Sequence, residues 1–366
     1  MAVGGLGGQG VSLPPLLRVT DLRTHYFGFR GSRVVKAVDG VSFTLEAGET
    51  FGLVGESGCG KTTTCHSLVR LLSSGARIVG GRIELDGEDL LTKSPAEMTA
   101  IRGRRIATIL QDPMASLDPL FSIYSQVAEP AYYHLGLRGR ALRQRVKELL
   151  GSVRIPSPES RMRELPHQMS GGMRQRIVGA IAQAGGPQII IADEPTTNLD
   201  VTIQLQYLNL LKELQRASGV ALVFVTHNLG IVAKMCDRVA VMYAGKIVEL
   251  QSVRGLFYDP RHPYTRALLD SIPKLGVREP LYIIPGQPPD LSALPDGCSF
   301  HPRCARAMDR CRVEEPPEYR FDGGGTARCW LTDEGRASAP GGRAAAPEGR
   351  ASAPGGRVSA PGARRG

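Results

Sequence analysis

The chain has 366 residues and a formal net charge of +10, but residues 335–366 hold six arginines against one glutamate, so the charge of the remainder does not indicate a nucleic-acid partner. The opening residues, MAVGGLGGQG, lack the basic and apolar regions of a secretory signal, and apolar runs such as ALVFV are far too short to cross a bilayer. We therefore expect a cytosolic protein with room for more than one domain, in which clustered cysteines bind metal or do redox chemistry more readily than they form disulfides.

A phosphate-binding loop is the first chemical motif in chain order. The segment TFGLVGESGCGKTTTCHSLVRLL predicts a short buried strand, a glycine-rich turn and a helix, which argues against a glycine-rich turn without function. Residues 55–62 fit the pattern GxxxxGKS/T, whose backbone N–H groups surround phosphate oxygens. Lys61 would reach the β- and γ-phosphates, and Thr62 would hold Mg²⁺. The predicted nucleotide-binding residues of this segment are Gly55, Glu56, Ser57, Gly58, Cys59, Gly60, Lys61, Thr62 and Thr63.

A second potential anion site follows in MSGGMRQRIVGAIAQAG. Ser170, Gly171 and Gly172 precede a helix whose apolar residues recur every three to four positions. A serine followed by glycines can simply cap such a helix, or it can present the helix N-terminus to a phosphate. Because one nucleotide needs only one phosphate loop, the sequence alone leaves open where this second device is used.

Two later strand ends carry acid–base side chains. PQIIIADEP places Asp193 at the end of a buried strand, where parallel strands of an open α/β sheet face the phosphate crevice. Asp193 would bind Mg²⁺, and Glu194 would act as the general base toward water, unless the two acids merely open a turn before proline. ALVFVTHNL delivers His227 to another strand end. A lone histidine is usually structural. Here, however, three predicted strands end in residues suited to phosphate chemistry, which favours a functional role for His227 at the same site.

The ordered set of motifs resembles the nucleotide-binding subunit of an ABC transporter. GESGCGKT, TILQDP, MSGGMRQR, IIIADEPT, TNLD and VTH follow one another in that family's order, and the resemblance covers residues 17–255. It implies an α/β P-loop NTPase cassette with a parallel-sheet core, an antiparallel β edge and an inserted helical subdomain. It also implies that two cassettes pair head to tail, so that the SGG helix of each closes over the ATP bound by the other.

The same resemblance implies roles for single residues. Gln111 would contact Mg²⁺ and sense the transmembrane partner, and Asp200 would lie in the loop that crosses the dimer interface. His227 would contact the γ-phosphate and help to hold the water, and Glu194 would be the catalytic carboxylate.

The sequence departs from the family pattern in two places. Met173 stands where the signature helix usually has glutamine, which changes little because Ser170 and backbone N–H groups supply the main phosphate contacts. The aromatic residue that stacks on adenine is not fixed by the motif HYFGF. Either Tyr26 or Phe29 would stack on the base, and a plain core or edge aromatic is the alternative.

The C-terminal part resembles the extension carried by ATPases of oligopeptide/dipeptide (and nickel) importers. HPYTRALL, PGQPP, a cysteine stretch that starts at Gly297, and Cys329-Trp330 all match that extension. The resemblance implies that such cysteines ligate a 4Fe–4S cluster, whereas their spacing fits neither zinc knuckles nor short ferredoxin runs. Tetrahedral zinc and reduced structural thiols stay as alternatives. The four cysteines are Cys298, Cys304, Cys311 and Cys329.

Four segments follow from these motifs. They are a flexible N-terminus at 1–14, the cassette at 15–255 with its helical subdomain near 115–170, a Cys-rich extension at 256–331, and a disordered Arg/Ala/Pro/Gly repeat at 332–366. Within the helical part, RGRALRQRVKELLGSV predicts a surface helix.

The combined interpretation is an Mg-dependent ATPase subunit that energises import of oligopeptides or dipeptides. The alternatives are the same role in a nickel or cation importer and a soluble ABC ATPase, which would normally carry a second cassette or a coiled-coil insertion. The resemblance implies a peripheral position at the cytoplasmic face of the cell membrane. It also implies as partners a second, related but non-identical ABC ATPase, two transmembrane permease subunits and an extracytoplasmic substrate-binding protein.

Overall fold

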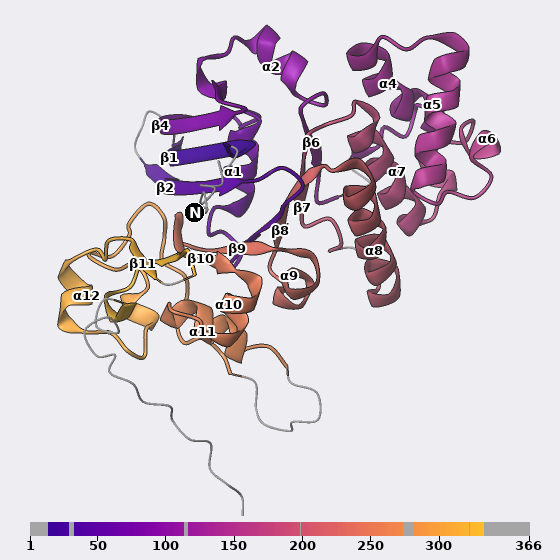
Figure 1. Ribbon diagram of the computed structural model, residues 1–366. Helices are drawn as coiled ribbons and strands as arrows, with labels where there is room; N and C mark the ends of the chain where they lie inside the picture. The colour runs from indigo at the N-terminus through magenta and orange to yellow at the C-terminus, as the bar shows by residue number, and fades with distance from the viewer. Residues whose placement is uncertain are drawn as a thin grey trace, which may run out of the picture.

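The computed structural model describes residues 14–28, 33–112, 116–197, 199–273, 282–321 and 323–332. The expectations for residues 1–13, for Phe29 and for the repeat tail from residue 333 onward concern residues outside this description. Two sheets, with helices packed on them, make up the described chain (Figure 1).

The larger sheet forms the centre of the molecule. Its strands are β3 (Thr50–Val54), β6 (Ile106–Ile109), β7 (Ile189–Asp193), β8 (Ala221–Thr226), β9 (Arg238–Tyr243), β10 (Lys246–Ser252), β11 (Tyr319–Phe321) and β12 (Gly325–Ala327). They are arranged in the order β11-β12-β10-β9-β3-β8-β7-β6, and the segment from β9 to β6 is parallel. Alternate residues of β8 enter two different cores, Leu222 and Phe224 on one face and Val223 and Val225 on the other. Burial of both faces explains why these strands are continuous apolar runs.

A four-stranded antiparallel sheet covers part of one face. Its strands are β1 (Leu17–Phe27), β2 (Val34–Leu45), β4 (Ala76–Leu85) and β5 (Glu88–Asp89), in the order β2-β1-β4-β5. Together with α1 (Lys61–Leu68) and the main sheet it encloses the second core, in which the rings of Phe43 and Phe51 stack with centroids 4.8 Å apart. The antiparallel part thus forms a separate sheet beside β3, and α1 starts between the two sheets (Figure 1).

A group of helices lies at the β6 end of the main sheet (Figure 1). It comprises α4 (Ile123–Leu135), α5 (Gly139–Ser152), α6 (Pro158–Arg161) and α7 (Gly171–Ala184), and it shares one core with α8 (Val201–Ser218) and α9 (Leu229–Met235). α5 is the helix predicted from RGRALRQRVKELLGSV. It buries Leu142, Val146, Leu149 and Leu150, one apolar stripe of an otherwise basic helix. Short helices elsewhere are η2 (Leu90–Thr92), α2 (Pro95–Ile101) and η3 (Pro166–Gln168).

The C-terminal residues pack directly on the main sheet. They form α10 (Val253–Tyr258), α11 (Pro263–Asp270), η4 (His301–Arg303), α12 (Asp309–Val313) and the strands β11 and β12. β12 pairs antiparallel with β10 through Glu249 and Ala327, so this region lengthens the central sheet. The rings of Tyr243, Tyr264 and Phe300 pack together with centroids 4.6–5.3 Å apart. None of the described helices is long and apolar enough to span a membrane.

Candidate active site

The glycine-rich loop joins β3 to α1 and leaves the start of that helix open. Gly58 and Gly60 have φ angles of +79° and +107°, in the region that favours glycine. A Cβ atom at Gly60 would lie 2.0 Å from the carbonyl oxygen of Ala37, and one at Gly55 would lie 2.2 Å from that of Met242. Because no side chain caps α1, the N–H groups of its first turn can bind an anion.

Lys61 places a buried positive charge at this helix start. Its residue is only 5% exposed, and Nζ donates hydrogen bonds to the carbonyl oxygens of Gly55 at 2.8 Å and Glu56 at 2.9 Å. A buried ammonium beside open N–H groups favours a negatively charged ligand. The loop therefore has the charge and the donors to bind phosphate groups.

Asp193 and Thr62 offer ligands for a divalent cation. Asp193 ends β7 and is 3% exposed; burial raises the pKa of its carboxyl, while a hydrogen bond with the Thr62 hydroxyl opposes that shift. Its Oδ1 atom is buried without a hydrogen-bond partner. Since Mg²⁺ prefers carboxylate and hydroxyl oxygens, the unpartnered oxygen beside Thr62 fits a Mg²⁺ ion bound with a nucleotide.

Glu194 is the centre of a small hydrogen-bond network. Its Oε1 lies 3.1 Å from Nδ1 of His227, and its Oε2 accepts hydrogen bonds from Gln111 Nε2 at 3.2 Å and Thr197 Oγ1 at 3.0 Å. Burial raises the pKa of Glu194, but the hydrogen bonds with His227 and Thr197 outweigh it and hold this pKa below the usual value. The backbone of Glu194 has a φ of +45°, in the left-handed region that residues other than glycine rarely adopt.

One cavity of about 690 Å³ brings Lys61, Thr62 and Glu194 together, and Asp193 lies beside Thr62 without lining it. Its lining includes loop residues, Gln111 after β6, Glu194 after β7 and His227 after β8, so three strand ends and the loop meet there. Tyr26 also lines the cavity, with its hydroxyl 3.3 Å from Thr63 Oγ1, so this candidate for adenine stacking lies at the site. The lining residues are Tyr26, Val35, Ala37, Ser57, Gly58, Gly60, Lys61, Thr62, Thr63, Gln111, Glu194, His227 and Leu291.

The second predicted anion site is not part of this cavity. Ser170 caps α7, where its Oγ accepts a hydrogen bond from Met173 N at 3.3 Å, and Gly171 and Gly172 form the first turn. Asp200 caps α8 in the same way, accepting from Thr202 N and Ile203 N. Neither cap lines the cavity, so within the described chain the two potential phosphate sites stay apart.

Sequence reasoning missed the contribution of the C-terminal region to the site. Leu291 lines the cavity, and Lys36 N donates to its carbonyl at 3.1 Å. Glu56, the second residue of the loop, is held by Tyr264 and Arg303 from the same region. The motifs HPYT and PRC contain these two residues, but neither motif signals a contact with a loop so distant in sequence.

The four C-terminal cysteines lie near one another without forming a recognisable metal site. Cys298 N donates to the carbonyl of Cys311 at 2.9 Å, and burial raises the pKa of Cys298 to about 11 and that of Cys329 to about 12. Over the described ranges, no group of three or more His, Cys, Asp or Glu side chains is arranged to hold a metal ion. Both the iron–sulfur prediction and its zinc alternative therefore lack support from this structure, and none of these four cysteines forms a disulfide.

Comparisons with known proteins match these features. A family model described as ABC transporter covers residues 38–197, and one described as oligopeptide/dipeptide transporter, C-terminal region, covers 248–311. The chain is 47% identical to the probable peptide ABC transporter ATP-binding protein y4tR of Sinorhizobium fredii over 322 residues, or 87% of this chain and 96% of the relative. It is 46% identical to the dipeptide transport ATP-binding protein DppD of Bacillus subtilis over 321 residues, or 87% and 95%. A solved dimeric post-hydrolysis state of the ATP-binding cassette MJ0796 bound to ADP and Pi matches with a TM-score of 0.58 and 26% identity, covering 65% of this chain and 99% of that chain.

Proposed function

The chain belongs to the ATP-binding subunits of oligopeptide/dipeptide ABC transporters, and on that basis we propose that it hydrolyses Mg·ATP to drive import of short peptides. The observation that carries the catalytic part is the single cavity in which Lys61, Thr62 and Glu194 meet. The peptide part is supported by the names of the relatives, which are peptide and dipeptide transport proteins. Import of nickel or another cation would use the same ATPase and is the alternative.

Each side chain at or beside the cavity has a separate task in this reaction. Loop N–H groups and Lys61 would hold the β- and γ-phosphates, and Thr62 and Asp193 would hold Mg²⁺, which neutralises phosphate charge when bound. Glu194 stays ionised at neutral pH because its pKa is lowered, so it can accept a proton from the attacking water. The contacts of its carboxylate with His227 and Gln111 fix its orientation toward the cavity.

We propose that the working unit contains two cassettes. Ser170, Gly171 and Gly172 lie outside the chain's own cavity, and Asp200 lies with them on the helical side of the molecule. In a head-to-tail pair, each set would close over the nucleotide held by the other chain. The second chain would be a related but non-identical ATPase, and the dimeric cassette MJ0796 gives a structural precedent for pairing.

A groove on the helical side is the proposed docking surface for the permease subunits. It has a volume of about 590 Å³ and is lined partly by α4 residues, including Tyr132 and Tyr133. Phe121 at its edge is 56% exposed, and Tyr133 is 72% exposed. Exposed aromatic side chains gathered at a groove are typical of a protein–protein contact. Docking there, beneath two permeases served by an extracytoplasmic binding protein, would place the chain at the cytoplasmic face of the membrane.

The proposed organisation is a cassette at residues 15–255, with its helical subdomain near 115–170, followed by the Cys-rich extension at 256–331. None of the four extension cysteines lines the cavity, so none of them has a direct role in the proposed ATPase chemistry. Metal analysis of protein purified without oxygen separates the three options for these thiols. Stoichiometric iron with sulfide would support a cluster, stoichiometric zinc a tetrahedral site, and a metal-free protein reduced thiols.

Reconstitution of the complete transporter tests the proposed function. The chain is purified with its partner subunits, placed in proteoliposomes, and supplied with ATP on its own side. We expect ATP-dependent accumulation of labelled di- to oligopeptides and no accumulation with Lys61→Ala. Accumulation of Ni²⁺ but not of peptides would select the alternative substrate, and no ATP hydrolysis by the intact complex would refute the ATPase assignment.

A further inference from the structure

An arginine of the extension holds the phosphate loop by a two-pronged ion pair. Arg303 Nη1 lies 2.6 Å from Glu56 Oε2, and Nη2 lies 2.9 Å from Oε1. The side chain of Arg303 is only 5% exposed, whereas that of Glu56 is 27% exposed. Parallel hydrogen bonds between a guanidinium and a carboxylate fix both distance and orientation, which a single lysine contact does not do.

The guanidinium is itself fixed from two further sides. Its Nε donates to the carbonyl of Pro285 at 2.9 Å, and Nη1 also contacts the hydroxyl of Tyr243 at 3.4 Å. Arg303 ends the short helix η4 and directly precedes Cys304. The ion pair therefore connects the phosphate loop to a buried, hydrogen-bonded part of the extension and not to a mobile surface side chain.

The backbone of Glu56 is held by the extension as well. Glu56 N donates to the hydroxyl of Tyr264 at 2.9 Å, and the Glu56 carbonyl accepts a hydrogen bond from Lys61 Nζ at 2.9 Å. Tyr264 is fully buried on α11. One loop residue is thus bound through its side chain, its N–H and its carbonyl, and the carbonyl contact leads directly to the lysine expected to bind phosphate.

We propose that Arg303 and Tyr264 are positioning residues that clamp the phosphate loop through Glu56 and thereby set its affinity for ATP. The inference rests on the proposed ATP site. The loop contains Gly55, Gly58 and Gly60, which add little stiffness of their own, so a fixed conformation of its N–H groups needs support from outside. Preorganised donors bind more tightly than donors that must first be ordered. The extension supplies that support here.

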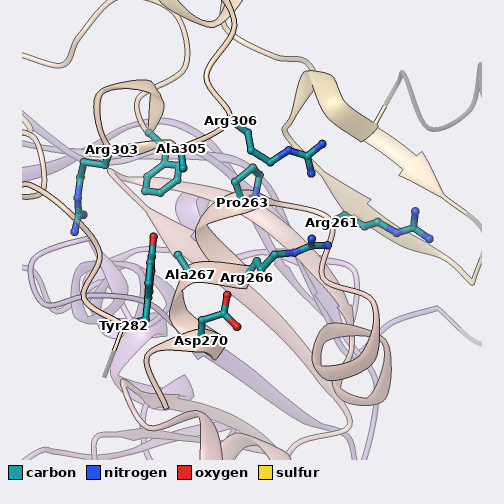
Figure 2. A pocket seen from close by; sticks show the side chains of 10 residues that line it. Arg261, Pro263, Arg266, Ala267, Asp270, Tyr282, Arg303, Ala305 and Arg306 are labelled. Atoms are coloured by element: carbon teal, nitrogen blue, oxygen red, sulfur yellow. The ribbon is translucent and has the colours of Figure 1, made fainter. Parts of the chain in front are cut away.

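A neighbouring arginine provides a matched control. Arg306 lies three residues after Arg303, and both border a pocket of about 200 Å³. The two side chains point to different sides, and that of Arg306 lies on the side of Arg261 and Arg266 (Figure 2). Arg306 is exposed and has no ion pair among the described residues. Arg306→Gln removes the same charge from the extension while leaving the contact between Arg303 and Glu56 intact.

Nucleotide affinity of the full chain tests the clamp. Fluorescent ATP binding and steady-state hydrolysis are compared for wild type, Arg303→Gln, Glu56→Gln and the double variant, all in complex with the partner ATPase. We expect Arg303→Gln to raise both Kd and KM at least about fivefold, the lower end of usual coupling effects, with kcat little changed because ground-state binding is lost. The double variant should bind no more weakly than the weaker single variant, since both remove one interaction. Arg306→Gln should bind like wild type.

Two further variants keep the outcome clear. If Arg303→Gln does not fold, Tyr264→Phe removes only the hydroxyl that accepts from Glu56 N, and a raised Kd is again expected. Wild-type affinity in a folded Arg303→Gln or Tyr264→Phe, or strictly additive losses in the double variant, would overturn the clamp. Lys61→Ala separates this from a failure of the site itself. If Lys61→Ala loses ATP binding while Arg303→Gln does not, only the clamp is wrong, and if both bind normally, the ATP site is wrong too.

Discussion

Replacing Glu194 with glutamine tests the proposed catalytic base most directly. The substitution keeps the size of the side chain but replaces one carboxylate oxygen by an amide NH₂. In the wild type, one oxygen lies beside His227, and the other accepts hydrogen bonds from Gln111 and Thr197. An amide NH₂ in place of Oε1 can still contact His227 Nδ1 when that nitrogen is unprotonated, and the remaining oxygen can still accept from Gln111 and Thr197, so the change that the substitution makes in every case is loss of the proton acceptor. General-base assistance is worth about 10²–10⁴-fold in rate, or about 2.7–5.4 kcal/mol of activation free energy. We expect kcat for ATP hydrolysis to fall by a factor in this range.

ATP binding should survive the same substitution. The observed hydrogen bonds of Lys61 go to the carbonyls of Gly55 and Glu56, and that of Asp193 goes to Thr62, so the residues proposed to hold phosphate and cation are not hydrogen-bonded to Glu194. A protein that binds but does not hydrolyse ATP should accumulate with the two cassettes closed on each other. Phosphate release, fluorescent nucleotide binding and light scattering on the complex with the partner ATPase measure the three expectations.

A matched surface variant makes the result interpretable. Glu213 pairs with Arg154 at 2.7 Å on the surface, where both side chains are more than half exposed. Glu213→Gln should therefore keep wild-type turnover. If Glu194→Gln hydrolyses ATP at the wild-type rate with an intact partner, Glu194 is not the base and the reasoning from its hydrogen-bond network is refuted.

Three other properties can be predicted from the structure. Gly60→Ala should lower the free energy of unfolding by about 2–5 kcal/mol, because its Cβ would clash with the Ala37 carbonyl and the positive φ is strained. The Cβ of Gly58→Ala would meet no atom within 4 Å, so this variant should lose only about 1–2 kcal/mol in thermal or urea melts. Equal losses for both glycines would contradict the close approach. His262 is buried, and burial lowers its pKa to about 3, so the unfolded chain, in which histidine titrates near 6.5, takes up the proton first as the pH falls. Its contribution to the free energy of unfolding should fall by about 2 kcal/mol from pH 7 to pH 5. The free energy of unfolding of His262→Gln, measured in urea, should therefore depend less on pH than that of the wild type. The same pH dependence in both proteins would mean that His262 is not neutral in the fold. A preparation shown by light scattering to be monomeric at the assay concentration should hydrolyse ATP poorly, and full activity in that preparation would disprove the composite site.

The parts of the site that follow from local sequence could be predicted. Glycine positions with positive φ mark the loop before Lys61, and buried apolar runs mark the strands that end at Asp193 and before His227. Parallel strands bring their carboxyl ends to one edge, so separate motifs can be placed in one crevice without knowing the full fold. The cavity collects Lys61, Glu194 and His227 in this way.

The parts that depend on tertiary pairing could not be predicted. The family resemblance assigned Gln111 and Glu194 to one ATP site, but it did not predict their direct contact, which spans 83 residues and depends on β6 and β7 being adjacent strands. Arg303 and Glu56 are 247 residues apart, and their contact depends on how the extension packs against the loop. The cysteine motif directed attention to metal binding, whereas the contact that this segment makes with the phosphate loop comes from Arg303, the residue before Cys304.

These contacts constrain how the proposed ATP site can open and close. The loop is held by its own chain, because Glu56 is hydrogen-bonded to Arg303 and Tyr264 of the extension. Leu291 of the same extension lines the cavity. The residues that would complete the site, Ser170 and its glycines, lie on the helical part of the other cassette in the proposed pair. Because the loop is fixed within its own chain, closure of the proposed pair would move the partner's helix toward a loop that is already formed. Weakening the clamp should therefore reduce the affinity for ATP without hindering the approach of the partner's helix. For this reason Arg303→Gln is expected to raise Kd with little change in kcat, whereas Lys61→Ala is expected to lose both ATP binding and turnover.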